Sequence, residues 1–139
     1  MMKSSRPIRI AYMEDDKGLA RLFQKRMHKH GYEVDVAHDG EQGLAMLDGR
    51  TYDFVAVDHK MPRRTGLEVI RTLASRGALP PTVMITGSAN EGIAVEALKL
   101  GAIDYVIKDA DLRYLDLLPH MIERALGSED TVDDLYEPL

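Results

Sequence analysis

The sequence predicts a single α/β domain in which helices cover both faces of a five-stranded parallel sheet. Two features of the 139-residue chain indicate this class. Five short apolar runs recur along the chain, and a segment with helical periodicity follows each of them. The connections between these segments are short, as in compact α/β units, and the length suits one domain with a sizeable core.

The first strand and the first helix are predicted over residues 8–13 and 19–31. The strand segment "IRIAYM" is mostly apolar, and Asp16 after it can cap the helix. Gly31 can end the helix, because glycine readily adopts the left-handed conformation found after many helices. Four apolar residues of the helix fall on one face: Leu19, Leu22, Phe23 and Met27.

The middle of the chain continues the alternation. Residues 32–38 alternate in polarity like a strand, and residues 39–49 form a short helix that Asp39 can cap. Residues 53–58 form a Val-rich run that ends in a carboxylate, Asp58. Such a continuous apolar run fits a central strand that is buried on both faces.

The remaining elements are a helix over 66–77, a strand over 81–87, a helix over 90–101, a strand over 104–108 and a helix over 114–126. Asn90 can cap the fourth helix and Gly101 can end it. Pro119 would be costly in a helix interior but is tolerated in a first turn. We therefore expect the regular part of the last helix to begin near Leu118, after a looser turn over residues 111–116.

The domain is expected to span residues 8–126, after an N-terminal extension over residues 1–7. Residues 127–139 read as an acidic tail or linker stub. The absence of Cys excludes disulfides and thiolate metal sites, and no apolar run is long enough to span a membrane. These features favour a cytoplasmic protein.

The charge balance argues against a nucleic-acid-binding protein. The formal net charge is −5, whereas a constitutive nucleic-acid surface needs a basic face. The basic segment "KMPRR" is more typical of a solvated loop, or of a rim for phosphate-bearing partners, than of a DNA contact.

Polar side chains gather where the predicted strands end. Glu14 and Asp15 follow the first strand, and the third, fourth and fifth strands end in Asp58, Thr86 and Lys108. Because the ends of parallel strands share one sheet edge, these groups converge if the strands are neighbours. Carboxylates about 4 Å apart repel by about 4 kcal/mol per pair at an effective dielectric of about 20. The cluster must therefore take up protons, pair with a lysine or bind a cation such as Mg²⁺.

This combination suits the transfer of a phosphoryl group to a carboxylate. An aspartate can act as a nucleophile and become an aspartyl phosphate. Phosphoryl transfer requires mainly positioning and neutralisation of oxygen charge. Mg²⁺, the ammonium of Lys108 and the hydroxyl of Thr86 can neutralise or hydrogen-bond the phosphoryl oxygens.

Four segments, "MEDD", "VAVDHKMPRRTGLE", "VMITG" and "GAIDYVIKD", together resemble the receiver domain of two-component response regulators. The resemblance covers nearly the whole chain and implies a flavodoxin-like (βα)5 fold with strand order 2-1-3-4-5. The sequence departs from the common pattern at Asp109, which follows Lys108 where many receivers have a proline.

The resemblance also implies roles for individual residues. Asp58 would be the phosphoacceptor, with Lys108 and Thr86 beside the phosphoryl group. Thr86 and Tyr105 would be the switch residues, whose positions differ between two states of the domain. Four groups would hold Mg²⁺ or Mn²⁺: Glu14 through a water molecule, Asp15, Asp58 and the backbone carbonyl of Lys60.

The expected function is a phosphorylation-dependent signalling switch rather than an enzyme with external substrates. A partner histidine kinase or phosphotransfer protein would donate the phosphoryl group. The phosphorylated domain would act on a downstream protein or an attached output domain, and could form a homodimer. No direct contact with nucleic acid or a membrane is expected.

Three alternatives are weaker. A degenerate receiver would bind partners without phosphorylation, but every chemical residue of the pattern is present. A phosphatase that uses an aspartyl-phosphate intermediate would carry a second Asp where this chain has Lys60. A flavodoxin-like cofactor binder would need a loop that attracts phosphate, and "EDDKG" is acidic instead.

Overall fold

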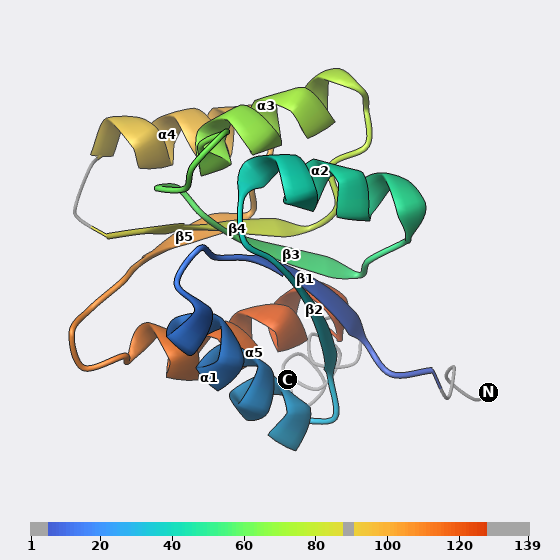
Figure 1. Ribbon diagram of the computed structural model, residues 1–139, viewed down its shortest axis with the longest axis vertical. Helices are drawn as coiled ribbons and strands as arrows, with labels where there is room; N and C mark the ends of the chain where they lie inside the picture. Colours follow the sequence, from blue (N-terminus) through green and yellow to red (C-terminus); the bar gives the residue numbers. More distant parts are fainter. Residues whose placement is uncertain (1–5, 88–90, 128–139) are drawn as a thin grey trace, which may run out of the picture.

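The fold is built around a five-stranded parallel sheet, as predicted. The computed structural model describes residues 6–87 and 91–127. The strands are ordered β2-β1-β3-β4-β5, so the chain changes direction across the sheet between β1 and β3 (Figure 1). Open α/β sheets place their ligand sites at such a switch point. The strands are β1 (Arg9–Met13), β2 (Glu33–Ala37), β3 (Phe54–Asp58), β4 (Thr82–Thr86) and β5 (Asp104–Ile107).

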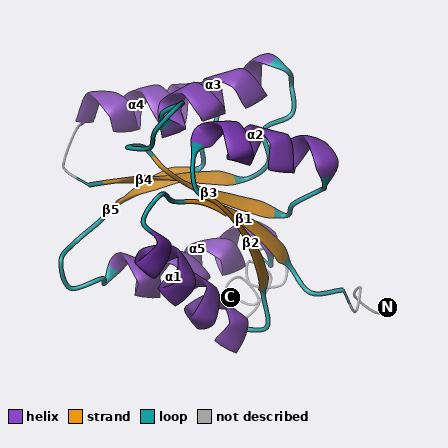
Figure 2. Cartoon of the chain, viewed as in Figure 1, coloured by secondary structure: helices purple, strands orange, loops and turns teal. Residues whose placement is uncertain are grey.

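Helices cover the sheet in two layers. One layer contains α1 and α5, and the opposite layer contains α2, α3 and α4 (Figures 1 and 2). The helices are α1 (Lys17–Lys29), α2 (Gly40–Gly49), α3 (Gly66–Ser75), α4 (Glu91–Leu100) and α5 (Tyr114–Leu126). None of the helices in the described ranges is long and apolar enough to cross a membrane.

The sheet separates two apolar cores. Successive residues of a strand point to opposite faces, so β3 contributes to both cores. Phe54 and Ala56 pack in the core under α1 and α5. Val55 and Val57 pack in the core under α2, α3 and α4. All five residues of β3 are buried, which confirms the prediction from its continuous apolar run.

Side-chain caps fix the starts of three helices. Asp16 accepts a hydrogen bond from an amide in the first turn of α1, and Asp39 does the same for α2, both as predicted. At α3, Thr65 and Glu68 form a reciprocal capping box. The third cap matters for the site, because it fixes where the loop after β3 ends.

The start of α5 differs from the prediction. The helix begins at Tyr114 and includes Pro119 in its interior. The carboxylate of Asp109 accepts hydrogen bonds from the amides of Arg113 and Tyr114, at 3.1 and 3.0 Å, and so supports the first turn. Burial of one helix face outweighs the cost of an interior proline, roughly 3 kcal/mol, since each large apolar side chain contributes about 1.5–3 kcal/mol when buried. The buried residues of this face include Tyr114, Leu115, Leu118 and Ile122.

Some predictions concern residues outside the described ranges. They are most of the N-terminal extension over residues 1–7, the helix cap at Asn90 and nearly all of the acidic tail over residues 127–139. The peptide bond between Lys108 and Asp109, where the sequence departs from the family pattern, is trans.

Candidate functional site

The carboxyl ends of four neighbouring strands bring the predicted site residues together. Asp58 is the last residue of β3 and is aligned with Ile85 of β4. Thr86 ends β4, and its carbonyl accepts a hydrogen bond from the amide of Lys108 at 2.8 Å. Glu14 directly follows β1. The convergence expected from neighbouring parallel strands is therefore present.

The ammonium group of Lys108 joins two buried carboxylates. Its Nζ lies 2.9 Å from Oε1 of Glu14 and 3.1 Å from Oδ2 of Asp58. Glu14 is fully buried, and the side chain of Asp58 is 4% exposed. Pairing with a lysine is one of the three ways in which such a cluster can reduce its repulsion, and it is the one seen here.

Glu14 is held by other donors besides Lys108. Its Oε1 also accepts a hydrogen bond from the hydroxyl of Tyr12 at 3.2 Å. Its Oε2 accepts one from the amide of Asp16 at 3.1 Å. Because both oxygens already accept hydrogen bonds, the arrangement favours contact between Glu14 and a cation through a water molecule.

Burial and neighbouring charges shift the pKa values of Asp58 and Lys108. Burial raises the pKa of Asp58 to about 6, the charge of Glu14 adds to the rise, and Lys108 opposes it. Burial acts to lower the pKa of Lys108, but the hydrogen bond to Glu14 and the charge of Asp58 outweigh it, so this pKa is raised. Near pH 7.5 the site therefore holds a mostly ionised Asp58 beside a charged ammonium.

Three carboxylates form a candidate site for a divalent cation. One oxygen from each of Glu14, Asp15 and Asp58 lies within 4.8 Å of the others. Asp15 is exposed, so solvent can reach the cluster from its side. An all-oxygen ligand set that is open to water matches the preference of Mg²⁺. Lys60 lies two residues after Asp58, in the exposed part of the loop that follows β3.

The two expected switch residues lie in different environments. Thr86 is 4% exposed and borders the cluster, whereas Tyr105 is 36% exposed on β5. Tyr105 is aligned with Met84, and Thr86 is aligned with Ile107. The structure thus groups Glu14, Asp15, Asp58, Thr86 and Lys108, and it leaves Tyr105 at the surface of β5.

A model of the response regulator receiver domain family matches residues 10–118. The chain belongs to this family. Receivers are phosphoacceptor regulatory modules of two-component systems rather than enzymes, which sets the phosphatase alternative aside.

Individual relatives agree with this assignment. The chain is 35% identical over 101 residues to the transcriptional regulatory protein DltR of Streptococcus agalactiae, a match that covers 73% of this chain and 45% of DltR. It spans about half the length of the curated relatives that it matches first.

Two solved structures show the same fold. A CheY-like receiver domain from Methanospirillum hungatei is 26% identical, with a TM-score of 0.78 over 91% of this chain and 99% of that one. TrrA from Thermotoga maritima, solved in complex with Mg²⁺ and BeF, is 25% identical, with a TM-score of 0.75 over 86% of this chain and 99% of TrrA.

The basic loop of this receiver is tied to its neighbour. Arg63 Nε donates to Asp39 Oδ2 at 3.1 Å, and Arg64 Nε donates to Glu41 Oε2 at 2.9 Å. A Cβ atom on Gly40 would lie 2.5 Å from Cβ of Arg64, so the loop touches the start of α2. Both arginines therefore hold the loop after β3 against α2, and the prediction of a simply solvated loop was incomplete.

Tyr12 and His59 support the receiver site through contacts that the sequence did not show. Tyr12 supports Glu14 from inside β1, and its place among apolar residues gave no signal of a polar role. His59 accepts a hydrogen bond through Nδ1 from the amide of Leu67 at 3.3 Å, and its carbonyl accepts one from Gly66 at 2.8 Å. His59 thus links Asp58 to the start of α3, and its position beside Asp58 was the available signal.

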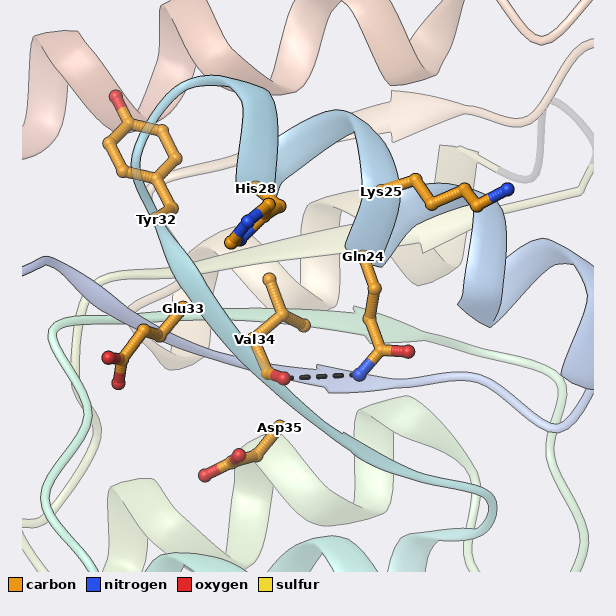
Figure 3. A pocket seen from close by; sticks show the side chains of 7 residues that line it. All are labelled: Gln24, Lys25, His28, Tyr32, Glu33, Val34 and Asp35. Atoms are coloured by element: carbon orange, nitrogen blue, oxygen red, sulfur yellow. Dashed lines mark hydrogen bonds between the residues drawn. The ribbon is translucent and has the colours of Figure 1, made fainter.

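A surface pocket of the receiver lies apart from the acidic site. It lies between the end of α1 and the edge strand β2, and in Figure 3 the amide of Gln24 points at the carbonyl of Val34. The nitrogen and oxygen atoms are 3.1 Å apart. The pocket is lined by Gln24, Lys25, His28, Tyr32, Glu33, Val34 and Asp35, none of which belongs to the acidic cluster.

Proposed function

We propose that this receiver accepts a phosphoryl group on Asp58 and thereby changes the surface that it offers to partners. The donor is the phosphohistidine of a partner histidine kinase or phosphotransfer protein. The observation that carries the proposal is the ammonium of Lys108, which lies within 3.1 Å of Asp58 and within 2.9 Å of Glu14. A nucleophilic carboxylate and a cation ready to neutralise the incoming oxygens are therefore already adjacent.

The transfer step makes one bond and breaks one. A carboxylate oxygen of Asp58 forms the new P–O bond, and the P–N bond to the donor imidazole breaks with its electron pair left on nitrogen. Lys108 remains protonated and neutralises the transferred group, to which the hydroxyl of Thr86 donates a hydrogen bond. Because the pKa of Asp58 is about 6, the nucleophile is mostly ionised near pH 7.5.

Mg²⁺ or Mn²⁺ fits the ligand set of the cluster. Asp15 and Asp58 would hold it directly, Glu14 through water, and the carbonyl of Lys60 would complete the protein ligands. When bound, the cation neutralises phosphoryl oxygen charge. Support comes from the structural relative TrrA, which was solved with Mg²⁺ and BeF.

The output surface is proposed to include α4 and β5. Thr86 and Tyr105 carry the change there, since Thr86 borders the phosphoryl site and Tyr105 belongs to the exposed surface. Large apolar side chains are exposed nearby on or beside these elements: Val95, Leu98, Ile103, Tyr105 and Ile107. They would contact a downstream protein or an attached output domain, or a second copy in a phosphorylation-linked homodimer.

We also propose boundaries for the receiver domain and a cellular location for it. The receiver domain proper would comprise residues 8–126, with the flanking segments as an extension and a tail or linker. It would act in the cytoplasm, without direct contact with nucleic acid. The curated relatives are longer than this chain. The proposal therefore concerns the receiver domain alone and not the response of a complete protein.

Intact mass spectrometry after incubation with acetyl phosphate tests the proposal. With Mg²⁺ the wild-type protein should gain the mass of one phosphoryl group, and it should gain none when Mg²⁺ is chelated. The Asp58→Asn variant should gain none in either condition, because its amide is not a nucleophile at phosphorus.

Two results would contradict the assignment. A gain that persists in Asp58→Asn would place the nucleophile elsewhere. No gain in the wild type, either with acetyl phosphate or with a panel of phosphorylated kinases, would favour the degenerate receiver that works without phosphorylation.

A further inference from the structure

Helix α1 carries a row of exposed cations. Its sequence contains no Asp or Glu, whereas Lys or Arg recurs at every fourth position. Side chains four residues apart are neighbours on the surface of a helix, so these cations lie in one row along α1. They are called the basic stripe here, and all four are exposed: Lys17, Arg21, Lys25 and Lys29.

The basic stripe has no acidic partner in the part of the chain that the structure describes. Most of the described arginines pair with a carboxylate, including Arg26 of the same helix, whose Nη1 lies 2.7 Å from Oδ1 of Asp116. Within residues 6–87 and 91–127, no ion pair involves a residue of the stripe. Like charges at this spacing destabilise a helix, and the helix dipole disfavours a cation at Lys17, in the first turn. Folding alone therefore does not account for the stripe.

The stripe borders a groove between α1 and the edge strand β2. Two adjoining pockets form the groove, and Lys17, Arg21 and Lys25 line its α1 side. The β2 side carries two carboxylates, Glu33 and Asp35, which already pair with arginines at 3.7 and 2.9 Å. In Figure 3 the ammonium of Lys25 points away from both carboxylates. The α1 side of the groove therefore suits an occupant with negative charge.

Residues 128–139, most of the acidic tail, have the complementary charge. Their sequence, SEDTVDDLYEPL, contains five acidic residues and no Lys, Arg or His. Because the formal net charge of the whole chain is −5, the rest of the chain is neutral in sum. Glu129, Asp133 and Glu137 are spaced by four residues, as the cations of the stripe are. This spacing keeps them on one side of either a helix or a strand.

The tail starts close to the end of α1. Gly127, the last described residue, lines a pocket together with Gly31 and Tyr32, which lie just after α1. Tyr32 also lines the groove beside the stripe. The 13 residues of α1 rise about 20 Å along the helix axis, whereas the tail segment can span about 40 Å when extended. The tail is therefore long enough to follow the whole stripe.

We propose that residues 128–139 dock along the basic stripe of α1 as an acidic strap. The carboxylates of the strap pair with the stripe cations, and the strap runs antiparallel to α1 toward Lys17. Lys17 follows Asp15 by two residues, so the strap reaches the edge of the acidic site. A docked strap covers α1 against other acidic surfaces, and a partner that binds there must displace it. This docking goes beyond the proposed function and does not depend on phosphorylation.

Paramagnetic broadening of amide signals in the full 139-residue chain tests the proposal. The chain has no Cys, so Leu139→Cys gives one attachment point for a nitroxide spin label. Relative to the reduced label, the amides of Gly18 and Leu19 should lose most of their intensity, because the far end of the strap lies at the start of α1. The loss should disappear in about 1 M salt, where the Debye length falls to about 3 Å.

Two matched double variants separate the stripe from a general effect of charge. Lys17→Glu/Lys25→Glu reverses two charges of the stripe and should abolish the broadening at the start of α1. Lys60→Glu/Lys99→Glu changes the net charge equally, and its two lysines are exposed but lie outside α1. The broadening should persist in this control. If both variants kept it, or both lost it, the stripe would not be the docking site and the proposal would be wrong.

The remaining outcomes identify other occupants of the groove. Broadening confined to Gly31, Tyr32 and Leu126 would mean that the tail stays near its start, and the stripe would be left to a separate acidic protein. Broadening of isotope-labelled protein by a spin-labelled second copy would place the strap between two chains. Either result overturns the proposal. None of these measurements involves phosphorylation of Asp58, so a failure here leaves the proposed function untouched.

Discussion

Asp58→Asn should unfold at a higher urea concentration than the wild type at pH 7.5, although it removes the central residue of the site. The ionised carboxylate is buried next to Glu14, and burial and repulsion raise its pKa to about 6. A rise from an ordinary value of 3.8 corresponds to a penalty of about 3 kcal/mol at neutral pH. Asparagine keeps the shape and an acceptor for Lys108, but it does not carry the buried charge.

The pH dependence of folding stability explains why Asp58→Asn should stabilise the protein. Well below pH 3.8 Asp58 is protonated in both folded and unfolded protein, so the ionisation penalty is absent. As the pH rises from 3.8 through about 6, the unfolded chain ionises more readily than the folded one, and the wild type loses stability. The advantage of Asp58→Asn should therefore be full at pH 7.5 and nearly absent at pH 4, as measured by urea unfolding at each pH.

Asp53→Asn is the control with the opposite sign. The carboxylate of Asp53 accepts two hydrogen bonds from Arg6, each at 3.0 Å, and these hydrogen bonds lower its pKa against the effect of partial burial. Its loss should lower stability at pH 7.5, and the difference should fade as the pH drops below 3.8. If both variants changed stability in the same direction at pH 7.5, the account of Asp58 would be wrong.

Gly66→Ala should destabilise the fold and disturb the site together. A Cβ atom there would lie 2.6 Å from the carbonyl oxygen of Asp58 and 2.9 Å from Cα of His59. Both neighbours are backbone, so no side chain can rotate away, and the chain itself must move. We expect a loss of about 2–3 kcal/mol in urea unfolding, together with weaker Mg²⁺ binding by titration calorimetry, because Asp58 and the loop with Lys60 are displaced.

Gly49→Ala provides the comparison. Gly49 ends α2, and a Cβ atom added there would have no neighbour within 4 Å, so alanine should be neutral or stabilise by up to about 1 kcal/mol. Mg²⁺ affinity should not change in this variant. If Gly66→Ala were as stable as Gly49→Ala, the start of α3 would not be fixed against β3 as the structure indicates.

Much of the fold and site follows from short-range patterns in the sequence. The run over residues 54–57 is apolar without alternation, and β3 is indeed buried on both faces. The caps at Asp16 and Asp39 are local interactions, so the sequence shows them directly. The convergence of Asp58 and Lys108 was predicted on the condition that their strands lie close together, and the strand order came from the resemblance to receiver domains rather than from short-range patterns.

Other features depend on contacts between distant segments. The start of α5 could not be predicted from Pro119, because burial of Tyr114 and neighbouring residues overrides the local cost. Arg63 and Arg64 were predicted to lie in a solvated loop, because their partners, Asp39 at the cap of α2 and Glu41 within it, are distant in the sequence and come close only in the fold. Tyr12 reads as an ordinary core residue although Glu14 is close in the sequence, because the sequence does not show that the side chain of Glu14, which follows β1, turns back toward the hydroxyl of Tyr12.

The hydrogen bond between Gln24 and Val34 bears on how copies of this protein could assemble. The amide of Glu33 donates to Ile8 in the segment before β1, so the alternating carbonyl of Val34 faces the outer edge of β2, where Gln24 occupies it. The β5 edge instead bears exposed Ile103, Tyr105 and Ile107. A strand that added to the β2 edge at this carbonyl would have to displace Gln24. The hydrogen bond therefore protects one position of that edge against strand addition, a property of α1 and β2 that is independent of the acidic site.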